Sequence, residues 1–248
     1  GANKAEDEDA HDALTELIHR SIVQQSADKA TTMLHRLQAQ VLRESWNEKE
    51  HLLALEAACT LLSTVDIDRF PTNATHLRQR ETRDLIVQFR GIGEQKRTQN
   101  LLRNERVVGS LCWAFWHAIE LGLSLEASSL ENSVAAVRTL LGEEHPGSLA
   151  SRNNLAGAYR DSGRLTEAIA LYEQVLNDRT RILGEDHPDT LISRDNLAGA
   201  YISAGRLTEA IALYEQVLHD RIRVLGEDHP DTLTSRNNLA YAYESAGR

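Results

Sequence analysis

Acidic residues stand beside histidine at three regularly spaced places in this sequence. The triplets Glu143–His145, Glu185–His187 and Glu227–His229 are each followed by proline and lie 42 residues apart. Carboxylate oxygens and imidazole nitrogens are common metal ligands, so a metal site is one interpretation. Side chains that are adjacent in sequence rarely converge on one ion, however, and successive triplets are a whole repeat apart. We therefore favour capping of the helix that each proline begins, and we predict neither a metal site nor a bound cofactor.

No other combination of residues predicts catalysis. The string Gly91–Lys96 contains glycines and a lysine, but it lacks the G-x-x-x-x-G-K-S/T spacing of a phosphate-binding loop. No Ser-His-Asp or Cys-His set can be assembled from spacing alone. We predict that the chain is not an enzyme.

Charge and cysteine content limit the partners and the compartment. The 248 residues carry a net charge of −10 and have no basic cluster, so nucleic acids and anionic membranes are not expected partners. Cys59 and Cys112 have no paired spacing, which is typical of a chain in a reducing cytoplasm without disulfides.

The dominant feature of the sequence is an internal repeat. Residues Pro146–His187 and Pro188–His229 differ at 10 of 42 positions, and Pro230–Arg248 repeats the first 19 residues of the preceding copy with 4 differences. Self-similarity at such a fixed period indicates a solenoid of stacked units.

Each copy reads as two helices joined by a glycine turn. In the second copy, Pro188 suits the first position of a helix, and Gly205 ends it. Apolar residues then recur at intervals of three and four from Leu207 to Leu225, which predicts a second helix capped by Gly226. A hairpin of this size cannot bury its own apolar stripe and must stack on a neighbour.

These residues resemble a known repeat family. The strings Asn-Leu-Ala-x-x-Tyr, Gly-Arg-Leu-x-Glu-Ala and Leu-Tyr-Glu-Gln-Val-Leu are similar to the tetratricopeptide repeat. The 42-residue period and the Leu-Gly-Glu-Asp-His-Pro linker resemble the longer version found in kinesin light chains and many bacterial proteins. The resemblance implies an all-α, right-handed superhelical solenoid of antiparallel helix pairs, whose first helices line a concave groove that binds a peptide or protein segment.

Differences between the copies fall on one face of the first helix. The second and third copies differ at Ile192/Thr234, Asp195/Asn237, Gly199/Tyr241 and Ile202/Glu244, at intervals of three, four and three residues. A packed surface resists changes such as Gly to Tyr or Ile to Glu, so we expect this face to be open to solvent or to a ligand. The resemblance implies that it is the recognition face; neutral drift on a solvated face is the alternative.

Asn154, Asn196 and Asn238 form a constant row of asparagines beside the varied positions. Asparagine both donates to and accepts from peptide backbone, and in kinesin light chain repeats the matching asparagines hold a bound peptide. Alternatively, these asparagines, with Arg152, Arg194 and Arg236, tie adjacent repeats together. The lysine-rich clamp of other family members is not apparent, since no lysine follows Lys96. The complete predicted groove comprises Asn153, Asn154, Arg160, Ile192, Asp195, Asn196, Gly199, Ile202, Thr234, Asn237, Asn238, Tyr241 and Glu244.

The repeats set the predicted domain boundaries. We expect a mainly helical N-terminal module over 1–103, a degenerate repeat over 104–145, full repeats over 146–187 and 188–229, and the first helix of a truncated repeat over 230–248. In the degenerate repeat, Trp113, Phe115 and Trp116 are expected to bury the N-terminal edge of the array, although the apolar run Val107–Leu125 approaches the length of a membrane span. Leu239 and Tyr243 lack a covering helix in this sequence, which predicts self-association or a truncated chain.

The N-terminal module suggests a second class of function. Ser21–Gln25 and Thr31–Leu34 could form two strands around a turn, and Met33–Glu44 resembles the end of the winged-helix module in bacterial STAND-type signalling NTPases. We interpret 13–45 as a winged-helix remnant, followed by a helix over Trp46–Val65. The resemblance implies a sensor fragment of a nucleotide switch. His35 matches a histidine near the nucleotide in such proteins, but it could not bind a nucleotide alone.

Overall fold

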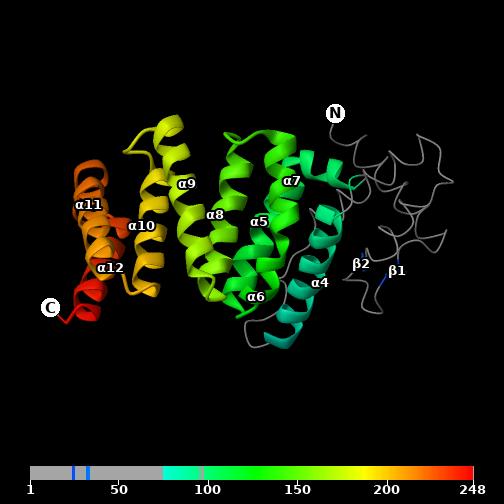
Figure 1. Ribbon diagram of the computed structural model, residues 1–248, viewed down its shortest axis with the longest axis horizontal. Coiled ribbons are helices and arrows are strands. Elements are labelled where there is room, and N and C mark those ends of the chain that lie inside the picture. The colour runs from blue at the N-terminus through cyan, green and yellow to red at the C-terminus, as the bar shows by residue number, and fades with distance from the viewer. Residues whose placement is uncertain (1–23, 26–31, 34–74, 95, 97, 248) are drawn as a thin grey trace. The chain divides into compact units, whose positions relative to one another are not determined.

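The computed structural model describes residues 24–25, 32–33, 75–94, 96 and 98–247 (Figure 1). The chain divides into two compact units between Glu143 and Glu144. Strands β1 (Gln24–Gln25) and β2 (Thr32–Met33) pair antiparallel, with Gln24 opposite Met33. They lie within the two ranges predicted for strands. The winged-helix interpretation beyond Met33 and the helix predicted over Trp46–Val65 lie outside the described residues.

The rest of the first unit is helical. The elements are α4 (Thr75–Glu94), the 3₁₀ helix η1 (Gln99–Arg103), α5 (Glu105–Glu120), α6 (Ser124–Ala127), the 3₁₀ helix η2 (Ser128–Leu130) and α7 (Glu131–Leu141).

Glycine often interrupts a helix, yet α4 continues through Gly91 and Gly93 to Glu94. Gly93 instead allows α4 to approach α7 closely. A Cβ atom placed on Gly93 would lie 2.4 Å from the backbone nitrogen of Ser133, and the Ser133 hydroxyl donates to the Phe89 carbonyl at 2.5 Å. The glycine signal therefore reports close helix packing here and not a turn.

The apolar run in α5 packs inside its unit. Leu111 and Phe115 are fully buried, Trp113 is half-buried and Trp116 is 58% exposed. That these aromatic residues cover the edge of the repeat array stays a prediction. The ring of the buried His117 makes edge contacts with Trp113 and Trp116. Among the described residues, none of the helices combines the length and the apolar character needed to cross a bilayer.

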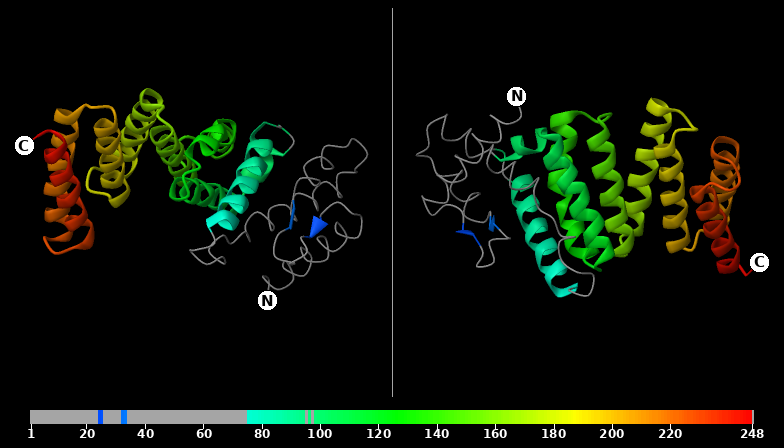
Figure 2. Two further views of the ribbon diagram at one scale, coloured as in Figure 1. Left: turned by 90° about the horizontal axis from the view of Figure 1, so that it is seen from below. Right: turned by 180° about the vertical axis from the view of Figure 1, so that it is seen from behind.

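The second unit is a series of five helices. They are α8 (Pro146–Asp161), α9 (Leu165–Leu183), α10 (Pro188–Ser203), α11 (Leu207–Leu225) and α12 (Pro230–Ser245). Each helix packs against the next, and α8 with α10 and α10 with α12 are also in contact. Figure 2 shows the same succession from below and from behind. The all-α class predicted from the sequence is confirmed.

The ends of these helices follow the sequence signals. Proline is the first residue of α8, α10 and α12, and α9 and α11 end at Gly184 and Gly226, both with φ of 92°. That left-handed conformation is strained for residues with a side chain, so glycine suits the position.

Two apolar clusters hold the hairpins together. One joins Ala156 on α8 to Tyr172 on α9, Leu197 on α10 and Ala210 on α11. The other joins Ala198 on α10 to Ile211 and Tyr214 on α11 and Ala242 on α12. Both clusters draw on more than one repeat, so no hairpin covers its stripe alone.

A buried arginine links each repeat to the following one. Arg179 on α9 donates to the Asp189 carbonyl at 3.1 Å and to the Ser193 hydroxyl at 2.7 Å, both on α10. Arg221 repeats this arrangement with the Asp231 carbonyl and the Ser235 hydroxyl on α12. Burial lowers the pKa of Arg179, so its hydrogen bonds must offset the cost of keeping a buried charge.

Arg179→Ala should therefore destabilise the second unit. The substitution removes two charge-assisted hydrogen bonds between repeats and leaves the Ser193 hydroxyl without this donor. We expect the free energy of unfolding to fall by about 2 kcal/mol, measured by urea denaturation. Arg181→Ala is the matched control, because Arg181 lies on the exposed side of the same helix and makes exposed ion pairs with Glu144 and Asp178. Equal effects of the two substitutions would contradict this role for Arg179.

Candidate functional site: the first-helix face

The varied positions lie on α8, α10 and α12, and we call this surface the first-helix face. It is open at Ile192, which is 44% exposed, and at Tyr241, which is 59% exposed. Thr234, Asn237 and Glu244 on α12 are also exposed, whereas Asn153, Asp195 and Gly199 are half-buried.

Ile202 does not fit the expectation of an open face. Its side chain is partly buried and packs against both apolar clusters, between neighbouring repeats. Arg160 and Glu244 occupy the matching positions of α8 and α12. Position 202 thus contributes to stacking. The sequence argument assumed that a position which varies between isoleucine and glutamate must be exposed in every copy, whereas Ile202 is packed and Glu244 is exposed.

The asparagine row connects adjacent first helices. Asn196 on α10 donates from Nδ2 to Asn153 Oδ1 on α8 at 3.3 Å. Asn238 on α12 donates from Nδ2 to both carboxylate oxygens of Asp195 on α10, at 3.2 and 3.3 Å. These bonds correspond to the alternative in which asparagines tie repeats together. Each bond uses only part of the amide, so Oδ1 of Asn196 and Asn238 can still accept from another group.

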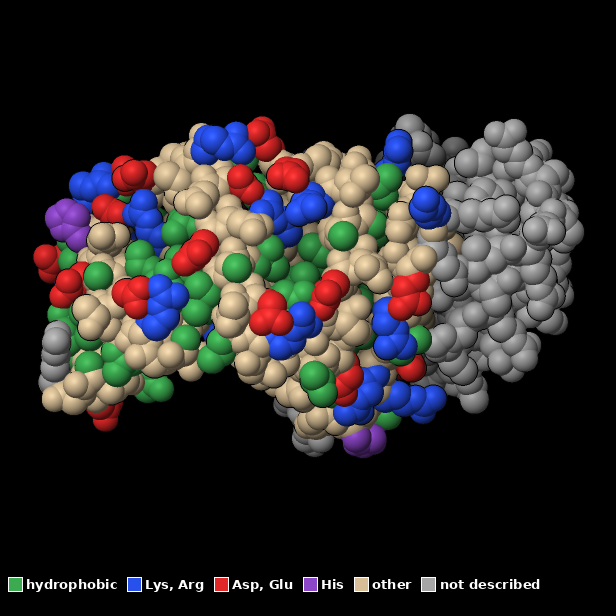
Figure 3. Space-filling model, viewed as in Figure 1, with side chains coloured by type: hydrophobic (Ala, Val, Ile, Leu, Met, Phe, Trp, Pro, Cys, Tyr) green, Lys and Arg blue, Asp and Glu red, His purple; other side chains and the backbone are tan. Residues whose placement is uncertain are grey.

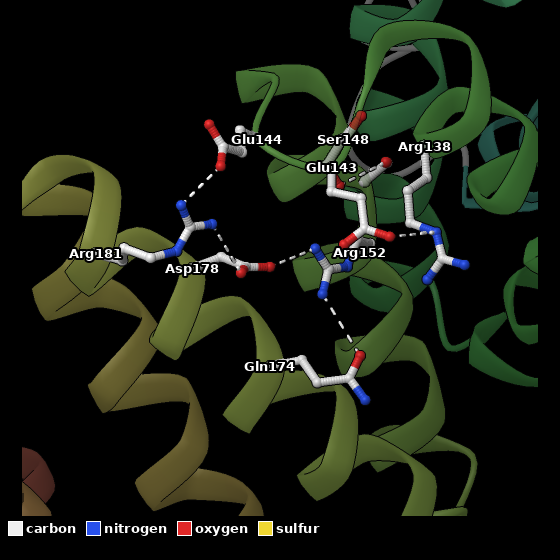
Figure 4. Close-up of polar contacts among 9 residues, drawn as sticks. Arg138, Glu143, Glu144, Ser148, Arg152, Gln174, Asp178 and Arg181 are labelled. Atoms are coloured by element: carbon white, nitrogen blue, oxygen red, sulfur yellow. Dashed lines mark hydrogen bonds and ion pairs between the residues drawn. The ribbon is translucent and has the colours of Figure 1, made fainter.

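The arginine row has a different function from the asparagines. Arg152 on α8 donates to Asp178 Oδ2 on α9 at 2.8 Å, and Arg194 on α10 makes the same contact with Asp220 on α11. Figure 4 shows Arg152 pointing towards Asp178 and Gln174. Arg152 and Arg194 thus fasten the two helices of one hairpin to each other. Arg194 also lies 3.8 Å from Glu185, and Arg236 pairs with Glu227 at 3.4 Å, so these two arginines contact the linker that ends the preceding repeat.

The residues around Gly199 form the most distinctive part of the face. A Cβ atom on Gly199 would lie 3.5 Å from Arg160 Nη1 and 3.5 Å from the Tyr214 hydroxyl. Arg160 uses Nε to donate to Asp161 at 2.7 Å, and neither of its Nη groups donates to a described residue. A methyl group would fit there at ordinary contact distance, and we call this place beside Arg160 and Tyr214, where Gly199 lacks a side chain, the Gly199 gap.

The groups around the gap are hydrogen-bond donors at neutral pH. Burial lowers the pKa of Arg160, but the hydrogen bond to Asp161 and the nearby Tyr172 and Tyr214 together raise that pKa by more, so the net shift is upward. Burial raises the pKa of both tyrosine hydroxyls to about 12, and both stay protonated. The gap can therefore donate hydrogen bonds to a carbonyl or carboxylate oxygen.

Sequence reasoning missed Tyr214 as a part of the site. Tyr214 was counted in the apolar stripe of the second helix, and Tyr172 is its equivalent in the preceding copy. The available signal was their type: a buried tyrosine usually directs its hydroxyl to a polar partner or to the surface.

A separate hollow of about 640 Å³ lies beside α11 and does not include the varied positions. Its lining is polar, and Arg194 within it is already paired with Asp220. Figure 3 shows acidic and basic side chains interspersed on the viewed face of the described residues. The described residues contain no group of three or more His, Cys, Asp or Glu side chains placed to hold a metal ion. The histidines of the acidic triplets instead cap helices α8, α10 and α12.

Comparisons with known proteins identify the fold. A family model described as tetratricopeptide repeat matches residues 127–177, 148–221 and 196–248. One similar crystal structure is that of a kinesin light chain candidate from Podosopora anserina with nearly identical TPR-like repeats. Its sequence is 32% identical and the TM-score is 0.50. The match covers 68% of this chain and 87% of that chain. A variant of the same protein has the same identity and coverage, with a TM-score of 0.51. The chain belongs to the tetratricopeptide repeat family.

A more distant solved structure supports the fold alone. BtubC (BKLC) from P. vanneervenii is 16% identical, with a TM-score of 0.54, covering 98% of this chain and 82% of that one. No match was found among curated proteins. Tetratricopeptide repeats generally serve as protein–protein interaction scaffolds.

The half-buried carboxylate of Asp195 gives a testable pH dependence. Burial raises the pKa of Asp195 above its ordinary value of 3.8, against the opposing effects of Arg221 and Asn238. A carboxyl group whose pKa is higher in the folded than in the unfolded protein is costlier to ionise in the folded state. The free energy of unfolding therefore falls as the pH rises through the raised pKa of the folded state. Asp195→Asn, which copies Asn153 and Asn237, should therefore raise the urea midpoint of unfolding at pH 7.

This gain should shrink as the pH is lowered towards 3.8, because the Asp195 carboxyl becomes protonated in the parent protein as well. Asn196→Asp is the opposite change at the adjacent position and should destabilise at pH 7. A lower midpoint for Asp195→Asn at pH 7 would show that the Asn238 and Arg221 contacts outweigh the burial cost.

Proposed function

We propose that this tetratricopeptide array is a non-catalytic scaffold that holds an extended segment of a partner protein against its first-helix face. The observation that carries the proposal is the Gly199 gap. Arg160 there keeps both Nη groups available beside a position without a side chain. A partially buried guanidinium with unused donors is suited to a ligand oxygen, because charge-assisted hydrogen bonds are among the stronger polar contacts.

Neighbouring residues offer the other contacts that an extended segment needs. Asn196 and Asn238 keep amide oxygens that can accept from peptide backbone N–H groups, in addition to their bonds between repeats. Ile192 and Tyr241 present exposed apolar surface on α10 and α12, which can receive alternate side chains of the segment. Backbone contacts at constant asparagines and side-chain contacts at varied positions would combine sequence-tolerant binding with selectivity.

Two narrower interpretations remain predictions. A sensor role in a STAND-type switch depends on the resemblance over Met33–Glu44, which lies outside the described residues except for Met33. Self-association through Leu239 and Tyr243 of α12 also stays a prediction; both side chains are half-buried and pack against the apolar cluster that includes Ala242. Light scattering at high concentration tests it.

Selection from a phage-displayed library of random linear peptides tests the proposed function. We expect the intact chain to enrich peptides whose binding weakens by about tenfold in Arg160→Gln, because a donor to a ligand oxygen is lost. Asn196→Ala should weaken the same peptides. Fluorescence anisotropy with labelled, selected peptides measures both effects.

Arg181→Gln provides the control, since it removes the same charge from an exposed site on α9 away from the first-helix face. Circular dichroism checks that helicity is unchanged in every variant. Enrichment of no peptide, or equal affinity of all three variants for the selected peptides, would contradict the proposed function.

A further inference from the structure

Helix α12 carries a second stripe of residues beside the first-helix face. Leu233, Arg236 and Ala240 follow one another at intervals of three and four residues, each one position before a varied residue of that face. Successive residues of an α-helix are turned by about 100°, so this stripe lies on another side of α12. We call Leu233, Arg236 and Ala240 the α12 side stripe.

In α10, the matching stripe is covered by α11, the second helix of the same hairpin. Arg194 of this stripe donates to Asp220 on α11 at 2.8 Å. Ala198 belongs to one apolar cluster with Ile211 and Tyr214 of α11. The leucine of the stripe, Leu191, is 1% exposed. This side of α10 is therefore a buried joint between two helices.

The preceding repeat has the same joint. Arg152 on α8 donates to Asp178 on α9 at 2.8 Å, and Ala156 on α8 shares an apolar cluster with Tyr172 on α9. Leu149 is buried, as its counterpart in α10 is. The covering helices α9 and α11 differ at only 3 of their 19 residues. Two copies of the repeat thus show the kind of helix that fits this stripe.

On α12 the stripe is open within the part of the chain that the structure describes. Leu233 is 45% exposed, whereas Leu191 is 1% exposed. The side chain of Arg236 is 41% exposed, whereas that of Arg194 is 12% exposed. Arg236 pairs at 3.4 Å with the exposed Glu227 of the linker. Exposed ion pairs are weak, so Arg236 can exchange this partner for a carboxylate that a docked helix brings.

The two covering helices define the chemistry of an occupant. In α11, Ala210, Tyr214 and Val217 are buried at intervals of four and three residues, and Asp220 follows three residues later. α9 has the same residue types at the same spacing. A helix that packs on α12 in this way therefore needs an apolar stripe of small and large residues, with an aspartate one turn beyond it.

We propose that the α12 side stripe is a docking surface for an amphipathic helix of a separate polypeptide, built like α9 and α11, whose aspartate pairs with Arg236. Burial of Leu233 and Ala240 supplies affinity, and the ion pair fixes the register of the docked helix. The joint would have the same composition as the joints on α8 and α10. It does not depend on the Gly199 gap or on the binding of an extended segment.

A synthetic peptide with the sequence of Leu207–Leu225 tests the proposal, by fluorescence anisotropy of the labelled peptide with the full chain. We expect saturable binding, about tenfold weaker for the peptide that carries Asp220→Asn. Arg236→Gln in the protein should weaken the unmodified peptide by the same factor. It should not weaken the asparagine peptide further, because both changes remove one ion pair. Isolated helices of this length are marginal in water, so circular dichroism should also show a gain in helix on binding.

Two matched variants locate the docked helix. Arg194→Gln alters the equivalent residue of α10, so it should lower the affinity only if the peptide displaces α11 within the chain. Arg160→Gln alters the first-helix face and should leave the affinity unchanged, which separates this surface from that of the proposed function. Circular dichroism checks that each variant is folded.

Three outcomes would overturn the proposal. They are a peptide that does not bind, equal affinities of the two peptides, and a loss of affinity in Arg194→Gln but not in Arg236→Gln. A dimer of the chain alone, detected by light scattering and abolished by Leu233→Asp, would also overturn it, because the occupant would then be a second copy.

Discussion

Each helical hairpin of this protein has an apolar stripe that only the next hairpin can cover. Tyr172 and Ala210, although on different repeats, belong to one cluster, and Ala198 and Ala242 belong to another. Burial of apolar surface therefore stabilises the joint between repeats as much as the repeat itself. The near identity of the copies follows from this constraint, because a residue that packs across one joint must also fit the next.

Polar side chains give the joints their direction and register. Arg179 and Arg221 cross from a second helix to the following first helix, where they meet a backbone carbonyl and a serine hydroxyl. Asn196 and Asn238 cross between successive first helices. Buried polar groups are costly unless they are hydrogen-bonded, so these contacts disfavour joints that are slipped by a turn. The apolar clusters alone would not impose that register.

Variation is confined to places where stacking does not depend on it. Ile192 and Tyr241 are exposed, and Gly199 adjoins the available Nη groups of Arg160. Ile202 and Asp195 are exceptions, since both vary in sequence, yet Ile202 packs between repeats and Asp195 accepts a hydrogen bond from Asn238 of the next repeat. A surface built in this way can change its ligand contacts without changing the joints, which is a useful property in an interaction scaffold.

The sequence by itself determined the repeat period, the helix pairs and their ends, because proline, glycine and apolar spacing act within a few residues of each other. It also placed the varied residues on one helix face. It did not show that Gly93 is a site of close helix packing, or that Tyr214 adjoins Gly199. Nor did it show that Arg152 contacts Asp178 within its own hairpin, whereas Asn196 contacts Asn153 in the neighbouring one. Those facts depend on how far apart the packed helices lie and how they are rotated. Such distances are set jointly by all the side chains at a joint, so only the tertiary structure decided them.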